Sequence, residues 1–243
     1  MTVVSIEREG PLALVRYDRG GKANALNMEA IEALMAAADE LAADTGVQVV
    51  VLTGTESRFS AGVDLDDDQL WQKGADPVVR SRAMAAGGRM CERWLRLPQV
   101  TIAAIEGAAI GGGAILALAA DFRVAGEGAY FRFPEVKLGM TLGWGGLPLL
   151  SGLIGATRAK RALFTDQRIE AEEALSIGLC DELAVKGGAV DAARALAEKI
   201  ALCPPSALRM TKRSIDASLR ANWVAGFEQD QFYLSRTLTE QGG

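Results

Sequence analysis

The chain of 243 residues contains no histidine, and this absence removes a large share of enzyme chemistry. A Ser-His-Asp triad, a Cys-His nucleophile pair and an H-E-x-x-H zinc site are all excluded. Any general acid or base must therefore come from Asp, Glu, Lys, Tyr or Cys side chains. We expect no metal site.

Cysteine is scarce as well. Cys91, Cys180 and Cys203 are widely spaced, odd in number and form no C-x-x-C pair. This usage is typical of a protein kept in a reducing compartment, with the thiols packed as small core residues. The N-terminus reads as a strand with charges at residues 7–9, so no signal peptide is visible and a cytoplasmic location is expected.

The chain also has no basic stripe and no uninterrupted membrane-length apolar helix. Its formal net charge is −5, which makes nucleic acid a poor candidate partner. Residues 101–120 are mostly apolar and long enough to cross a bilayer, but they contain Glu106 and four glycines. A strand, a glycine turn and a buried helix explain this run better, so we expect no membrane partner.

What is present is an alternation of strand and helix patterns. Asn27 is placed to cap a helix whose apolar residues recur on one face, and two valine-rich or isoleucine-rich runs are typical of strands buried on both faces. The alternation up to about residue 185 predicts an α/β layered core. We predict strands at 2–8, 12–17, 47–52, 100–105 and 121–125, and helices at 28–43, 77–96, 112–119 and from about 157 onward.

Two glycine-containing turns, 59–65 and 106–113, follow two of the predicted buried strands. Three consecutive glycines at a helix start let the backbone approach a ligand and direct free N–H groups at it. One N–H from each turn would suit a developing oxyanion. The alternative is that the glycines only allow close helix–sheet packing. A nucleotide site is less favoured, because the G-x-G-x-x-G spacing is not met.

With the flanking residues included, the pattern resembles the crotonase (enoyl-CoA hydratase/isomerase) family over about residues 3–185. The segments that carry the resemblance occur in the family's order. They are Asn24-Ala25-Leu26-Asn27, Phe59-Ser60-Ala61-Gly62-Val63-Asp64-Leu65, residues 103–113, Ala120-Asp121-Phe122-Arg123, Phe133-Pro134-Glu135-Val136-Lys137-Leu138-Gly139, and Glu172-Glu173-Ala174-Leu175 with Ile177-Gly178-Leu179.

The resemblance implies a spiral of repeated β-β-α units over residues 1–185 and a C-terminal helical region, 186–243, that builds homotrimers or hexamers. It implies an acyl-CoA thioester as substrate, with coenzyme A entering as part of that substrate and no separate cofactor. The thioester oxygen would accept hydrogen bonds from the backbone N–H groups of Val63 and Gly112, with Ala61 and Asp64 beside it.

The family's hydratases use two glutamates on one water, and this chain matches only the second. Ile115 stands at the first position and Glu135 at the second. An isoleucine cannot activate water, and it makes the pocket drier, which should raise the pKa of Glu135. One carboxylate suits a proton shuttle in which C2 of a 3-enoyl thioester loses a proton and C4 gains one. We therefore favour Δ3-Δ2-enoyl-CoA isomerisation, unless Glu135 is merely a solvated residue in a turn.

Other positions are candidates for contact with the substrate. Gly143 and Trp144 would lie near the acyl group, and the apolar residues 147–150 fit either an acyl pocket or plain core packing. Lys22 and Arg58 precede the two motif segments and are candidates for the coenzyme A phosphates, although each is more simply explained as a solvated surface charge.

Two alternatives remain open. Another reaction of the family, such as hydration, decarboxylation, C–C cleavage or thioester hydrolysis, needs a polar group from elsewhere, for example Glu127 or Asp68. A non-catalytic acyl-CoA-binding subunit is the alternative of a different class. We also expect a helix near 225–238. The resembled family usually continues beyond this helix into a terminal helix that covers the coenzyme A site, and the sequence to Gly243 does not contain that terminal helix.

Overall fold

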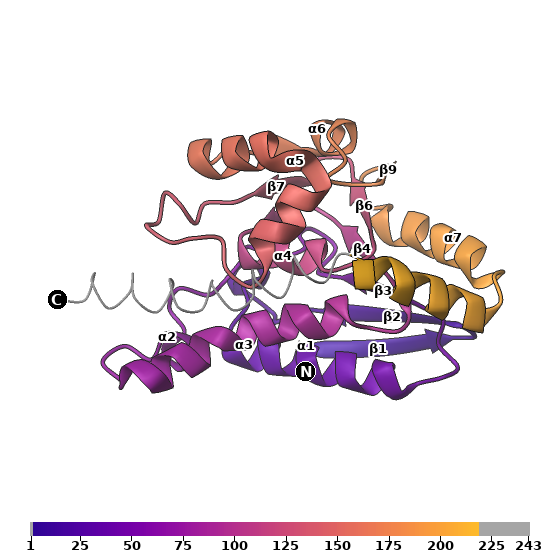
Figure 1. The fold of residues 1–243 in the computed structure, drawn as a ribbon, viewed down its shortest axis with the longest axis horizontal. Coiled ribbons are helices and arrows are strands. Elements are labelled where there is room, and N and C mark those ends of the chain that lie inside the picture. Colours follow the sequence, from indigo (N-terminus) through magenta and orange to yellow (C-terminus); the bar gives the residue numbers. More distant parts are fainter. Residues whose placement is uncertain (1, 219–243) are drawn as a thin grey trace.

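The computed structural model describes residues 2–218 (Figure 1). Its main element is a six-stranded sheet in the order β1-β2-β3-β4-β6-β9. The first two strands form an antiparallel hairpin, and every later neighbour is parallel. The strands are β1 (Val4–Glu9), β2 (Leu12–Tyr17), β3 (Val49–Thr53), β4 (Val100–Ile105), β6 (Phe122–Gly126) and β9 (Glu182–Ala184).

Helices cover both faces of this sheet. Every residue of β3 and β4 is buried, as their unbroken apolar runs predict. One face packs with α1 (Met28–Ala43), α3 (Pro77–Leu95) and α4 (Gly112–Leu118), and the other with α7 (Ala189–Ala201). The Asn27 side chain accepts a hydrogen bond from the Ala30 N–H at 3.0 Å, which confirms the predicted cap of α1.

A second, three-stranded sheet shows the repeat of the fold. It contains β5 (Ala108–Ile110), β7 (Tyr130–Arg132) and β8 (Ile169–Glu170) in the order β5-β7-β8. The successions β4-β5-α4 and β6-β7-α5 (Gly146–Thr165) are two β-β-α units, since their first strands pair in the large sheet and their second strands in the small one. The predicted α/β class is confirmed.

Helices dominate the described residues from about 157 onward, as predicted, but two short strands that the sequence did not indicate lie among them. α5 begins at Gly146, and the strands β8 and β9 lie on either side of α6 (Ala171–Ser176). These strands have two and three residues, too few to show a period of alternation. The remaining short elements are the 3-10 helix η1 (Lys22–Asn24) and α2 (Asp68–Trp71).

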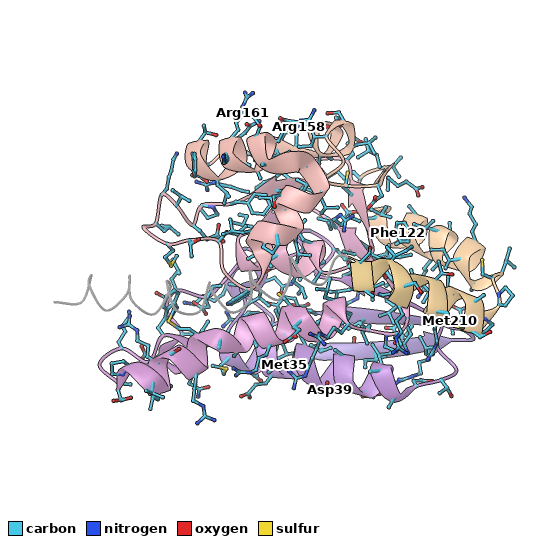
Figure 2. The ribbon with its side chains drawn as sticks, in the orientation of Figure 1. Met35, Asp39, Phe122, Arg158, Arg161 and Met210 are labelled. Carbon is cyan, nitrogen blue, oxygen red and sulfur yellow. The ribbon has the colours of Figure 1, made fainter. Side chains whose placement is uncertain are left out.

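The described residues after 185 pack onto the core, mainly through α7. Ala189, Ala193 and Ala197 of α7 are buried against the large sheet, and the Ala189 N–H donates to the Glu106 carboxylate at 2.9 Å. A helix over 205–218 follows, and Met210 lies at its surface (Figure 2). The predicted boundary at 185 stays a prediction, and the helix expected near 225–238 lies outside the described residues.

No helix within residues 2–218 is long and apolar enough to cross a membrane.

Candidate active site

The structure brings the two glycine turns into contact. The Ser60 N–H donates to the Ala108 carbonyl at 2.8 Å, and the Ile110 N–H donates to the Ser60 carbonyl at 3.0 Å. A Cβ atom on Gly62 would lie 2.7 Å from the Ile110 carbonyl oxygen and 3.6 Å from the Gly112 nitrogen. Only glycine permits this approach, which sets the first turn directly against the start of α4.

The segment Asn24-Ala25-Leu26-Asn27 is hydrogen-bonded to the first glycine turn. The Leu26 N–H donates to the Gly62 carbonyl at 2.7 Å, and the Asp64 N–H donates to the Leu26 carbonyl at 2.9 Å. The buried Asn24 amide donates to the Phe59 carbonyl at 2.8 Å. These bonds flank Val63, so its peptide is held in one orientation.

The backbone N–H groups of Val63 and Gly112 lie at this junction. Gly112 is the first residue of α4, where the N–H groups have no partner inside the helix. Val63 and Gly112 both line one cavity of about 190 Å³. This arrangement suits an oxyanion that accepts one hydrogen bond from each turn.

Glu135 reaches the same junction from the loop after β7. Its side chain is 9% exposed. A Cβ atom on Gly111 would lie 2.7 Å from Glu135 Oε1, so the carboxylate rests against the backbone beside Gly112. Glu135 Oε2 is buried and has no hydrogen-bond partner among the described residues. Burial is the main cause that raises the pKa of Glu135 to about 7, and the nearby Asp166 carboxylate contributes to the same shift. A solvated surface glutamate is thereby excluded.

Ile115 contributes to the apolar surroundings of Glu135. It lies one turn into α4, where its N–H donates to the Gly111 carbonyl at 2.9 Å, and its buried side chain lines the cavity. Among the described residues that line the cavity, Glu135 is the one carboxylate. Glu127 and Asp68, the alternative acids, are exposed and do not line it.

The rest of the cavity is apolar for the most part. Gly143 and Trp144 line it, as the sequence predicts. The apolar residues 147–150 do not, because they lie in α5, where Leu149 and Leu150 belong to the core. The lining consists of Ala61, Gly62, Val63, Leu65, Leu70, Trp71, Met84, Ile110, Gly111, Gly112, Ile115, Pro134, Glu135, Leu138, Met140, Thr141, Gly143 and Trp144.

Three predicted substrate contacts lie outside the lining. Asp64 is buried and forms an ion pair with Arg19 at 2.7 Å, so its position supports a structural role in place of the predicted one. Lys22 is exposed and pairs with Asp66 at 2.7 Å. Arg58 is exposed on the turn before Phe59. Their short sequence distance from the motifs does not bring these side chains to the cavity.

Several residues of the site escape prediction from the sequence. Trp71 and Met84 reach the cavity from α2 and α3, and no spacing pattern links these helices to the glycine turns. Asp166, at the end of α5, is a further residue that the sequence did not indicate. Both of its carboxylate oxygens accept hydrogen bonds from the Arg132 guanidinium, and the distance from Arg132 Nε to Asp166 Oδ1 is 2.7 Å. No three His, Cys, Asp or Glu side chains within residues 2–218 are grouped so as to hold a metal ion.

Comparison with known proteins agrees with this geometry. The family model described as enoyl-CoA hydratase/isomerase matches residues 7–242. The chain therefore belongs to the enoyl-CoA hydratase/isomerase family, and the resemblance seen in the sequence is confirmed at that level.

Among individual relatives, the chain is 34% identical over 232 residues to a protein of Clostridium acetobutylicum named short-chain-enoyl-CoA hydratase, covering 94% of this chain and 87% of the relative. It is 31% identical to an enoyl-CoA hydratase from Bacillus anthracis, with a TM-score of 0.83 over 99% of this chain and 89% of the other. An enoyl-CoA hydratase/isomerase from Mycobacterium paratuberculosis is 26% identical, with a TM-score of 0.91 over 100% and 96% of the two chains.

Proposed function

We propose that the protein acts on an acyl-CoA thioester, stabilises its enolate through the Val63 and Gly112 N–H groups, and isomerises a 3-enoyl-CoA to the 2-enoyl-CoA. The observation that carries this proposal is that Glu135 is the one carboxylate among the described residues that line the cavity. Glu135 lies against Gly111, one of its oxygens has no partner within residues 2–218, and its pKa is about 7. A group with that pKa both accepts and returns a proton near neutral pH.

The proposed reaction moves one proton and one double bond. The Glu135 carboxylate takes a proton from C2 of the 3-enoyl thioester, and the electron pair of that C–H bond moves toward the carbonyl. The dienolate oxygen accepts hydrogen bonds from Val63 and Gly112. Glu135 then returns a proton to C4, and the double bond is left between C2 and C3. Glu135 ends in its starting state, so no water and no second acid is consumed.

Glu135→Gln tests this assignment. The amide keeps the shape of the side chain but takes no proton, so turnover of a 3-enoyl-CoA should fall by about 100- to 10,000-fold. Binding of a saturated acyl-CoA should change little in the same variant, because the two backbone donors remain. Unchanged turnover in Glu135→Gln would refute Glu135 as the base. Binding without turnover in the native protein would favour a non-catalytic acyl-CoA-binding subunit.

Hydration of a 2-enoyl-CoA is the second candidate, because relatives in Clostridium acetobutylicum and Thermus thermophilus are named as enoyl-CoA hydratases. Hydration requires a group that activates water beside Glu135, and the cavity wall at position 115 is the apolar Ile115. Hydratase turnover by the native protein would therefore mean that Glu135 handles the water and both proton transfers alone.

A further inference from the structure

Trp144 holds an unusual backbone conformation beside the proposed reaction centre. Its φ is +57°, in the left-handed region that bulky side chains rarely adopt. Its side chain is nevertheless buried and lines the cavity that contains Glu135 and Gly112. A conformation of this kind persists only where the surroundings impose it, and such residues cluster at functional sites.

The indole of Trp144 is wedged between two glycines from different helices. A Cβ atom on Gly87 of α3 would lie 2.0 Å from Trp144 Cε2, and one on Gly112 of α4 would lie 2.5 Å from Cζ3. Gly87 lies inside α3, where glycine weakens a helix. The absence of a side chain at both positions makes the space that the indole fills.

The indole thus lines the cavity where α3 and α4 are in contact. Val63 Cγ2 would lie 3.0 Å from a Cβ atom on Gly112, so Trp144 and Val63 flank the same backbone atom. An acyl chain that starts at the two N–H donors therefore meets the indole on its way between the helices.

The size of the cavity sets a scale for that acyl chain. It measures about 190 Å³ and includes the space beside the N–H donors where the thioester carbonyl belongs. A protein cavity of about 150 Å³ accommodates benzene. By that measure the thioester carbon, its oxygen and an acyl tail of about four to six carbons fill the space.

We propose that Trp144, seated against Gly87, ends the acyl site and restricts the substrate to short acyl groups. This inference rests on the proposed acyl-CoA function and adds the substrate class and the residue that sets it. Removal of the indole would open a channel between α3 and α4 that a longer chain can enter.

The test measures binding, so that it does not depend on turnover. Affinities of butanoyl-, hexanoyl-, octanoyl- and dodecanoyl-CoA are compared between the native protein and Trp144→Gly by calorimetry. Glycine suits the φ of +57° at this position, so the backbone is not strained by the change. The native protein should prefer butanoyl- and hexanoyl-CoA. Trp144→Gly should gain at least about tenfold for dodecanoyl- relative to butanoyl-CoA, since each methylene newly buried contributes about fourfold.

Leu138→Ala is the matched control. Leu138 also lines the cavity but is 48% exposed, so its loss widens the mouth and should not shift the preferred chain length. Gly87→Ala adds a second check. Its methyl group would displace the indole and weaken hexanoyl-CoA binding in the native background, and it should have no such effect when Trp144 is already glycine.

The outcomes separate this inference from the proposed function. Native protein that binds dodecanoyl-CoA as tightly as hexanoyl-CoA, or a Trp144→Gly profile that matches the native one, overturns the role of Trp144. A short-chain preference that Trp144→Gly relaxes supports it, even if the native protein does not isomerise 3-enoyl thioesters. Failure to bind any of the four thioesters overturns both proposals.

Discussion

At the scale of single residues, the burial of Glu135 is unfavourable for folding but suits the proposed proton transfer. Its carboxylate is buried, and one oxygen has no partner among the described residues. A buried charge without compensation is unfavourable, so the protonated form is favoured and the pKa rises to about 7. A carboxyl group that is half ionised near neutral pH serves as a base in one step and as an acid in the next.

The pH dependence of activity follows from this pKa. Proton abstraction requires the ionised form of Glu135, which is the minor form below a pKa of about 7. We predict that kcat/KM for a 3-enoyl-CoA falls about tenfold per pH unit below that value and levels off above it. Steady-state rates across the pH range provide the measurement. An acid limb near the usual carboxyl pKa of about 4.3 would contradict a buried base.

The ionisation of Glu135 that activity requires should lower the free energy of unfolding. The pKa of Glu135 is raised in the folded protein from an unfolded value near 4.5. Below the unfolded pKa the group is neutral in both states and does not reduce the stability of the fold. As the pH rises through the folded pKa, its ionisation destabilises the fold. Glu135→Gln should be more stable than the native protein by up to about 3 kcal/mol at about pH 8, with little difference at about pH 4. Urea denaturation at both pH values measures this, and a difference independent of pH would refute it.

Ile115 is the residue that separates the two candidate reactions. Ile115→Glu would place a second carboxyl group in the lining of the cavity that contains Glu135. We predict that this variant hydrates a 2-enoyl-CoA at least about 100-fold faster than the native protein, because two groups then share the work on one water. Ile115→Gln, which has the same shape but transfers no proton, is the control. Equal hydration by both variants would mean that polarity alone, rather than acid–base chemistry, is responsible.

The sequence predicts part of this site well. The cavity lining contains Val63, Gly112 and Glu135, which belong to motifs at fixed spacing. Lys22 and Arg58 stand close to those motifs in the sequence, but the direction of a long side chain does not follow from that closeness. The Lys22 ammonium is already paired with Asp66.

At the scale of elements, one buried carboxylate at the end of α5 anchors the first part of the loop that carries Glu135. Asp166 binds Arg132, before the loop, and lies 3.5 Å from the Lys137 ammonium within it. The Arg132 carbonyl also accepts the Gly111 N–H at 2.9 Å. The end of α5 therefore holds the Glu135 loop and the second glycine turn in one register.

Asp166→Asn tests this anchor. Asparagine tolerates the left-handed φ of +54° at this position, so the backbone is preserved. Removal of the carboxylate takes away a charge that raises the pKa of Glu135 and releases two cations nearby. We predict that the acid limb of kcat/KM moves to lower pH. A fall in rate with an unmoved limb would indicate that Asp166 acts only through structure.

The limits of prediction at this scale follow from element length. The helix at Met28–Ala43 and the strand at Val100–Ile105 are long enough to show a cap or a continuous apolar run. β5, β7, β8 and β9 have two or three residues each and form only because neighbouring chain segments supply their partners. Pairing between distant segments leaves no local pattern to read.

At the scale of the whole molecule, the described residues expose several large apolar side chains. Arg158 and Arg161 of α5 point away from the body (Figure 2), while Phe164 at the end of the same helix is 64% exposed. Leu202 and Ile215 are also exposed. Apolar side chains in such positions favour contact with another protein surface.

We accordingly retain the prediction of a homotrimer or hexamer. Sedimentation equilibrium at micromolar concentration should give a mass of three or six chains of 25.7 kDa. Replacement of Phe164 by glutamate provides a probe of one exposed position, and its effect on the mass would show whether that position is part of the contact. A monomer for the native protein would contradict the prediction.

The central claim is that one buried carboxylate beside two backbone donors moves a proton along an enoyl thioester. The most direct measurement gives the native protein a 3-enoyl-CoA and, separately, a 2-enoyl-CoA, and follows the absorbance of the conjugated thioester. The account predicts that conjugation appears from the 3-enoyl substrate and persists in the 2-enoyl substrate. Loss of conjugation from the 2-enoyl-CoA, with no gain from the 3-enoyl-CoA, would show a hydratase and contradict the account.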